Sequence, residues 1–293
     1  MSHLLTSLRV RHFWRPPVMS GAQLKWIVKL SHFGATKSGY AELLENANEL
    51  ERIFTLVSQQ RKQRNTPLIP KGATIGTQLH PVPVDPDAEF SIWAIAPSGS
   101  RCAHYEESLA KCFDADGRLT EKLPCSLHNH ISMALLVKHG KTNLILGGDV
   151  EEHGWQESLN EFGPVSAHAV KVSHHGSKTG YCDGLWQGHA SDGKPIGVVT
   201  PYRRHHLPRR EGLQHISPHV ERIAVPCAAA VFSDALPVPL SPHAPVKSRI
   251  ALQKELNATA DAVFEVGRCS FIFDNQGNCV EEHLEGPAGF LPL

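Results

Sequence analysis

The chain has 293 residues, of which 41% are hydrophobic and 20% are charged, and its 29 basic and 29 acidic residues leave no net formal charge. This balance is typical of a folded protein with a substantial core. It excludes a global charge that would draw the whole molecule to nucleic acid or to a membrane surface, so any such contact must come from a local patch. Histidine, with 19 copies, is the residue type that stands out.

The cysteines and the apolar segments indicate where the protein resides. The 7 cysteines are widely spaced and form no C-x-x-C pair, which argues against a zinc ribbon or a disulfide framework and favours a reducing compartment. No apolar run is long enough for a transmembrane helix, and residues 1–17 lack the apolar core of a signal peptide. We therefore expect a cytoplasmic protein without a membrane segment.

The first part of the chain predicts short strands around one long helix. Residues 8–14 predict a strand, and a helical apolar repeat over residues 40–64 predicts an amphipathic helix. Residues 90–95 alternate as a strand does and are followed by a proline. Residues 101–123 are polar and mixed, which indicates a helical or irregular excursion.

The second part of the chain alternates strands with helices. A hairpin of two buried strands is expected over residues 131–146 with its turn at Gly140, followed by a helix over residues 151–162. Further elements are predicted as strands at 169–172, 196–200 and 222–226, a short helix at 211–216, and a final hairpin with strands at 264–273 and 279–283. This order predicts one layered α/β or α+β domain over residues 1–293 with a mixed sheet.

One of these strands ends in a carboxylate suited to metal binding. The strand over residues 142–146 leads into a Gly-Gly-Asp sequence that ends at Asp149. The two glycines allow a tight turn and leave room for an ion or a substrate beside the carboxylate. A structural interpretation is also open, because Asp149 precedes the predicted helix and could cap its N-terminus. The two roles do not exclude each other.

A second strand, over residues 169–172, ends in the sequence Ser-His-His-Gly-Ser that finishes at Ser177. His174 follows Asp149 by 25 positions (174 − 149), enough chain for one helix and one strand to return to a neighbouring place in the sheet. Adjacent histidines at a strand end point in different directions, so one can ligate an ion while the other orients it or contacts substrate. Imidazoles with a carboxylate suit a borderline divalent cation; the alternative is a pair of histidines in a polar loop.

A basic segment follows the strand over residues 196–200. Residues 202–210 contain four arginines and one tyrosine, with Arg203 and Arg204 nearest the strand end. These arginines could hold the phosphates of a nucleic acid or a nucleotide. The alternative is a solvated loop.

Three segments taken together resemble a known fold. The sequences NHIS at 129–132, LGGD at 146–149 and KVSHHGS at 171–177 are similar to the metallo-β-lactamase fold. More narrowly, they resemble the hydrolase branch related to the soluble domain of ComEC-type DNA-uptake proteins. Members of that branch show an Asn-x-x-Ser, a Gly-Asp and a His-His-Gly-Ser in this order, and the likeness extends over residues 129–201.

The resemblance implies a fold, a cofactor and a reaction. The fold would be an αββα four-layer sandwich with one or two divalent ions, usually zinc or manganese, at the sheet edge. By motif, the catalytic residues would be Asp149 and His175, and the metal ligands would come from Asp149, His174, His175 and His130. The motif would place Asn129 and Ser132 at or near the site as substrate contacts; apart from the resemblance, the Ser177 hydroxyl and the basic residues Arg203 and Arg204 are further candidates for substrate binding. The reaction class would be metal-dependent hydrolysis, often of a phosphodiester, in a nucleic acid or a phosphate-bearing small molecule.

The chain departs from this family near its N-terminus. The family's His-x-His-x-Asp-His ligand motif, which precedes these segments in relatives, does not occur in the sequence. Residues 2–14 are similar to the segment that follows that motif, so we expect a sandwich that is incomplete at its N-terminus. Missing strands would leave an unpaired edge and uncovered apolar surface, which predicts an oligomer or a partner chain that covers them.

Three functional hypotheses follow. The first is a metal-dependent hydrolase of the phosphodiesterase or nuclease type that works with the remaining ligands. The second is a non-catalytic metallo-β-lactamase-like module that binds a ligand or a partner through the same cleft. The third is a piece of a normal enzyme whose main ligand motif is encoded upstream of Met1.

Overall fold

The computed structural model describes residues 12–17, 52–53, 55–56, 59, 70–81, 89–112, 114, 129–188, 193–202, 207–226 and 267–291. Contacts divide the chain into two compact units, Met1–Thr74 with Pro97–Ile131, and Ile75–Ala96 with Ser132–Leu293. The single domain expected over residues 1–293 stays a prediction. None of the helices formed by the described residues has the length and apolar character that a membrane span requires.

The first unit contains a pair of short strands and a capped helix. Strand β1 (Phe13–Arg15) runs parallel to β2 (Pro70–Gly72). Helix α4 (Gly99–Lys111) begins after Ser98, whose hydroxyl accepts the Arg101 N–H at 3.1 Å. A side-chain oxygen at this place satisfies one of the free N–H groups of the first turn. The excursion predicted after the strand at residues 90–95 is therefore helical in its first part.

The two N-terminal predictions lie mostly outside the described residues. Of the strand predicted over 8–14, residues 12–14 are described, and β1 accounts for the last two of them. Of the helix predicted over 40–64, the described residues 52, 53, 55, 56 and 59 are all helical.

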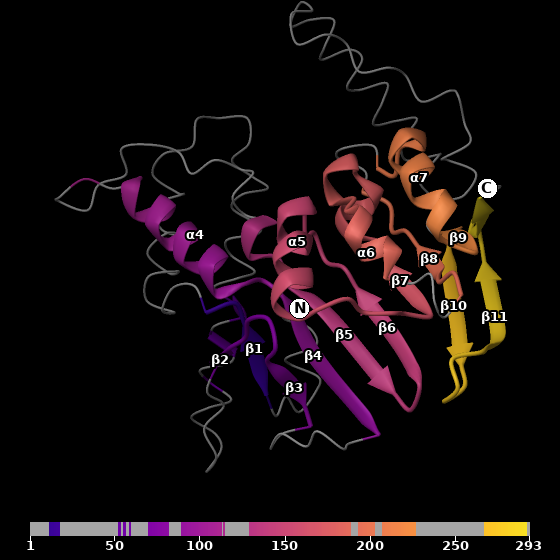
Figure 1. Ribbon diagram of the computed structural model, residues 1–293, viewed down its shortest axis with the longest axis horizontal. Coiled ribbons are helices and arrows are strands. Elements are labelled where there is room, and N and C mark those ends of the chain that lie inside the picture. The colour runs from indigo at the N-terminus through magenta and orange to yellow at the C-terminus, as the bar shows by residue number, and fades with distance from the viewer. Residues whose placement is uncertain are drawn as a thin grey trace, which may run out of the picture. The chain divides into compact units, whose positions relative to one another are not determined.

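The second unit is built on an 8-stranded sheet in the order β12-β9-β8-β7-β6-β5-β4-β3 (Figure 1). The strands are β3 (Gln78–His80), β4 (Phe90–Ala96), β5 (Ala134–His139), β6 (Thr142–Leu146), β7 (Ala169–Lys171), β8 (Ile196–Val198), β9 (Arg222–Val225) and β12 (Gly289–Leu291). Strands β6 to β9 run parallel to one another, whereas β3 to β6 are joined antiparallel and β12 pairs antiparallel with β9. The predicted mixed sheet is confirmed, and β12 is a strand that the sequence pattern did not indicate.

Helices occupy the connections between the parallel strands. They are α5 (Glu152–Glu161), α6 (Asp183–Gln187) and α7 (Arg210–Ile216), and they link β6 to β7, β7 to β8 and β8 to β9 in turn. Parallel strands need such crossovers because a tight turn reverses the direction of the chain and can therefore join only antiparallel strands. The helices predicted at residues 151–162 and 211–216 are confirmed.

One face of this sheet carries the core. Leu136, Ile145 and Val170 lie in register across β5, β6 and β7 and are fully buried. Trp155 of α5, also fully buried, packs in the same cluster, as does Trp186 of α6. Because side chains alternate along a strand, the residues next to these in sequence project to the other face.

A separate two-stranded hairpin, β10 (Arg268–Phe273) and β11 (Cys279–Glu285), follows the sheet in the chain. Its strands pair antiparallel, which confirms the predicted final hairpin. Its turn contacts the β5–β6 turn, where the Lys141 N–H donates to the Asn275 carbonyl at 2.8 Å. Asn278 donates from its side chain and backbone to the Asp274 carboxylate at 2.9 Å, which lowers the pKa of that carboxyl group and holds the turn.

Candidate functional site

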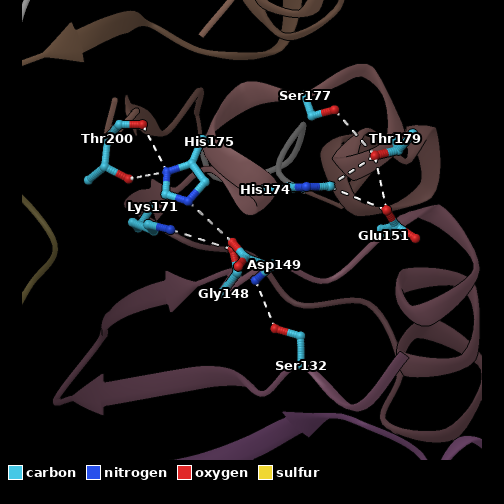
Figure 2. Close-up of polar contacts among 10 residues, drawn as sticks. All are labelled: Ser132, Gly148, Asp149, Glu151, Lys171, His174, His175, Ser177, Thr179 and Thr200. Atoms are coloured by element: carbon cyan, nitrogen blue, oxygen red, sulfur yellow. Dashed lines mark hydrogen bonds and ion pairs between the residues drawn. The ribbon is translucent and has the colours of Figure 1, made fainter. Parts of the chain in front are cut away.

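The parallel pairing of β6 and β7 brings the two predicted clusters together. Leu146 at the end of β6 lies opposite Lys171 at the end of β7. The segments that follow therefore leave the sheet at the same edge, and Asp149 Oδ1 lies 3.6 Å from His175 Nε2 (Figure 2). The expected return of the chain to a neighbouring strand is confirmed.

Two glycines let the loop after β6 pack tightly beneath Asp149. Gly148 has φ +56, and a Cβ there would lie 2.4 Å from the Met133 carbonyl oxygen. A Cβ on Gly147 would lie 2.3 Å from Ser173 Oγ. Real Cβ atoms do not approach other atoms so closely, so both positions require glycine for space, and Gly148 requires it for conformation as well. The Asp149 N–H then donates to Ser132 Oγ at 2.8 Å.

The capping interpretation of Asp149 is wrong. The N-cap residue of α5 is Glu151, and its side chain makes no capping hydrogen bond. Val150 and Glu151 separate Asp149 from the first residue of the helix, and the Asp149 carboxylate faces His175 instead. The Asp149 side chain is 45% exposed and can therefore be reached from solvent.

His175 is held in an orientation that leaves one ring nitrogen available. Its Nδ1 lies 3.1 Å from both the carbonyl oxygen and Oγ1 of Thr200. Because a carbonyl only accepts, Nδ1 carries the proton and Nε2 keeps its lone pair, directed at Asp149. The ring also stacks on Tyr202, with centroids 4.9 Å apart and an interplanar angle of 18°. Thr200 and Tyr202 were not assigned to the site from the sequence.

Electrostatics keep the His175 ring neutral. Burial, with smaller contributions from Lys171 and His174, lowers its pKa below the ordinary value of 6.5, although the hydrogen bond to Thr200 and the charge of Asp149 act in the opposite direction. A neutral imidazole is the form that ligates a metal.

The two histidines have an unusual backbone conformation. His174 has φ 47 and ψ 41, and His175 has φ 53 and ψ 30, so both are left-handed. This conformation costs a non-glycine residue roughly 1–2 kcal/mol. It is held by the His174 N–H, which donates to the Gly148 carbonyl at 3.0 Å, and by the Ser177 N–H, which donates to the His174 carbonyl at 2.8 Å. Strain of this kind is concentrated at functional sites.

As a consequence, His174 faces a second polar cluster. Its Nδ1 lies 3.0 Å from Thr179 Oγ1 and 3.4 Å from Glu151 Oε1. Thr179 donates to Glu151 at 3.2 Å, and Ser177 Oγ lies 3.3 Å from Thr179 Oγ1 (Figure 2). Glu151 was missed by the sequence analysis because it was read only as the start of the helix. A metal-ligating role for His174 and a substrate contact for Ser177 stay predictions.

Lys171 is a further residue at this edge that the sequence analysis did not single out. Its Nζ donates to the Gly148 carbonyl at 3.4 Å. Burial lowers the pKa of the ammonium, and the negative charge of Asp149 opposes that effect. A lysine as the last residue of a strand in an otherwise apolar sheet centre was the signal available in the sequence.

The remaining predicted site residues are divided between the two units and the residues that are not described. Asn129 and His130 belong to the first unit, in a 3-10 turn at residues 129–131, where the His130 ring stacks on His104 with centroids 6.1 Å apart. Ser132 begins the second unit and supports the Asp149 backbone. Arg203 and Arg204 lie outside the described residues. The site roles of Asn129, His130 and the two arginines stay predictions.

The spacing of Asp149 and His175 fits that of two ligands of one divalent ion. Two donors at about 2.0–2.1 Å from a shared tetrahedral ion stand roughly 3.3 Å apart, close to the observed 3.6 Å. Within the described ranges, no group of three or more His, Cys, Asp and Glu side chains is gathered closely enough to hold a metal. A catalytic zinc ion usually has three protein ligands, and Asp149 and His175 would account for two of them.

Comparison with known proteins gives one relative and no family assignment. No family model matches the chain. The chain is similar to ComE operon protein 3 of Bacillus subtilis (strain 168), with 34% identity over 95 residues. This match covers 32% of the chain and 12% of the relative's length. The similarity agrees with the competence-related resemblance of the three motifs and concerns a limited segment of each protein.

Proposed function

We propose that this chain is a metal-dependent hydrolase of phosphodiesters, related to the competence branch of the metallo-β-lactamase fold. The observation that carries the proposal is the Asp149–His175 pair. Oδ1 and Nε2 lie 3.6 Å apart, and the contacts of Nδ1 with Thr200 leave Nε2 free to ligate. The similarity to ComE operon protein 3 supports the choice of branch.

The topology around the pair supports the same proposal. A sheet whose parallel strands β6 and β7 deliver ligands at one edge, with α5 and α6 packed on one face, is compatible with half of an αββα sandwich. Ligands in open α/β sheets commonly bind at the carboxyl ends of the strands. The four-layer arrangement itself is part of the proposal.

The chain's own residues would divide the work as follows. Asp149 brings a negative charge and His175 a neutral nitrogen donor to one cation. Thr200 fixes the ring that carries this nitrogen, and Ser132 fixes the backbone that carries the carboxylate. A divalent cation bound there supplies Lewis acidity toward a phosphoryl oxygen and activates water at neutral pH.

Metal content of the purified chain, measured by inductively coupled plasma mass spectrometry, tests the proposal. We expect near-stoichiometric zinc or manganese, and hydrolysis of bis-p-nitrophenyl phosphate or single-stranded DNA that a chelator abolishes. Asp149→Asn and His175→Ala should lose both metal and activity. His153→Ala, an exposed histidine on α5, is the matched control and should retain both. A chain that binds neither metal above trace level contradicts the proposal.

A non-catalytic binding module is the second candidate. It is favoured by the finding that the described residues contain no group of three or more His, Cys, Asp and Glu side chains that could hold a metal. This candidate predicts that metal binds at the pair while neither phosphodiester is turned over, and that Asp149→Ala leaves the fold intact by circular dichroism. Measurable turnover that depends on Asp149 excludes it.

A further inference from the structure

We propose that Lys171 makes the Asp149–His175 site selective for anionic phosphate esters by presenting a fixed positive charge to the substrate. This inference rests on the proposed function and adds to it the residue that determines the charge class of the substrate. The ligand class is a phosphate mono- or diester, as opposed to a neutral carboxylic ester.

The position of Lys171 follows from the register of the sheet. Lys171 is the last residue of β7, between Leu146 of β6 and Val198 of β8. Val170, its neighbour in the chain, is fully buried in the core. Since successive side chains project to opposite faces, Lys171 lies on the face away from that core. From there its ammonium reaches the Gly148 carbonyl, in the loop after β6 that also carries Asp149.

The hydrogen bonding of the ammonium leaves capacity for a ligand. Lys171 Nζ donates to the Gly148 carbonyl at 3.4 Å, which is a long contact (Figure 2). An ammonium group has three donors. The carboxylate of Asp149 is the charge that acts on it most. A phosphate oxygen held between Lys171 and the metal position would therefore meet a point charge and a free N–H, the usual way in which lysine contacts phosphate.

The positive charge of Lys171 allows a role in substrate binding to be distinguished from a role in holding Asp149 in place. An ammonium beside a divalent cation repels it, so Lys171 should weaken metal binding unless an anion lies between them. If Lys171 only held Asp149 in place, its removal would weaken metal binding. If it serves the substrate, its removal leaves metal binding unchanged or tighter and weakens the binding of phosphate.

Three variants of the full chain make the test. Lys171→Met removes the charge at nearly the same volume, and Lys171→Arg keeps the charge. Lys141→Met, at the exposed opposite end of β6, removes a charge far along the strand and serves as the control. Thermal melting of each variant establishes that it is folded, and the Arg variant keeps the test valid if the Met variant is not.

The measurements use probes of defined charge. Zinc and manganese affinities come from competition with a chelating dye, and binding of inorganic phosphate is followed by calorimetry on both the metal-free and the metal-loaded chain. Hydrolysis of bis-p-nitrophenyl phosphate is compared with hydrolysis of the neutral p-nitrophenyl acetate. For Lys171→Met we expect metal affinity equal to or up to about 10-fold above wild type, and phosphate affinity and the phosphodiester-to-acetate ratio each lower by about 10-fold. Lys171→Arg and Lys141→Met should remain within about 3-fold of wild type.

The outcomes distinguish this inference from the proposed function. Wild-type chain that binds no metal overturns the proposed function, whereas loss of phosphate binding by Lys171→Met in the metal-free chain would still support the anion contact. Wild-type chain that binds metal and cleaves the phosphodiester, with an unchanged ratio in Lys171→Met, overturns the inference alone. Metal affinity that falls in Lys171→Met as far as in Asp149→Asn assigns Lys171 to positioning and also overturns the inference.

Discussion

The two histidines that follow β7 occupy different chemical surroundings although they are adjacent in the chain. His175 faces Asp149 and is fixed from behind by Thr200. His174 is turned toward Glu151, at the start of α5, and toward Thr179, which follows the histidine pair in the chain. Both belong to one strained left-handed turn, and that turn is what separates their side chains. The comparison teaches that a His-His pair can build two polar sites, of which the His175 side has the more exposed carboxylate, 45% for Asp149 against 27% for Glu151.

The largest expected effect comes from breaking the loop that both sides share. Gly148→Ala would place a methyl group against the Met133 carbonyl at a residue with φ +56. We expect the free energy of unfolding to fall by roughly 2–4 kcal/mol, measured by urea denaturation, because overpacking and backbone strain add. Gly163→Ala is the control, with φ +93 and nothing within 4 Å of the added Cβ, and it should cost only about 1 kcal/mol. Equal effects of the two substitutions would show that the Gly148 loop is not tightly packed.

A pair of carboxylate substitutions tests whether the two sides differ in metal binding. Asp149→Asn should weaken zinc or manganese binding by about 100-fold or more, since even partners of metal ligands cost about 10- to 100-fold. Glu151→Gln, on the His174 side, should change it by about 3-fold at most. Dye competition measures both. A large loss in Glu151→Gln would place the ion on the His174 side instead.

A pair of threonine substitutions tests the same difference in metal binding between the His175 side and the His174 side, with a smaller expected change in affinity. Thr200→Val removes one of the two oxygens at 3.1 Å from His175 Nδ1 and should weaken metal binding by about 10-fold, the lower end for a partner of a ligand. Thr179→Val removes the hydroxyl between His174 and Glu151 and should leave metal affinity unchanged, with a loss of stability of about 0.5 kcal/mol. The reverse order of metal affinities would contradict the assignment of His175.

The smallest expected effect is a pH dependence of stability that arises from His175. Its pKa in the folded chain is below 6.5, so well above pH 6.5 the ring is neutral in both folded and unfolded states and does not change stability. As the pH falls below 6.5 the unfolded chain takes up the proton first, and the metal-free protein loses stability until the folded-state pKa is passed. His175→Gln should remove this part of the slope in urea denaturation between pH 7 and pH 5. An unchanged slope would show that the ring is not shielded from solvent.

The strands and helices of the second unit could be predicted because their signals are local. The apolar run of β6, the amphipathic repeat of α5 and the Asn-rich turn between β10 and β11 each determine their own element. The meeting of Asp149 with the histidine pair could also be expected, since a strand, a helix and a strand return the chain to a neighbouring position.

Other features of the site were predicted wrongly from the sequence or were not predicted, because they depend on contacts between distant segments. The interpretation of Asp149 as a possible helix cap failed because the helix starts only at Glu152, and Glu151 is its N-cap residue. Nothing in the local sequence shows that Thr200, two residues after the end of β8, fixes the His175 ring. The role of Lys171 as a neighbour of Gly148 likewise depends on the pairing of β7 with β6.

The sequence by itself determined which residues could carry metal chemistry, namely a carboxylate and two imidazoles at the ends of two strands. Only the tertiary structure decided that Asp149 pairs with His175 and that His174 turns to Glu151. The physical reason is the left-handed turn after β7. Its conformation is unfavourable for histidine in isolation and exists because the Gly148 carbonyl on the neighbouring segment accepts the His174 N–H.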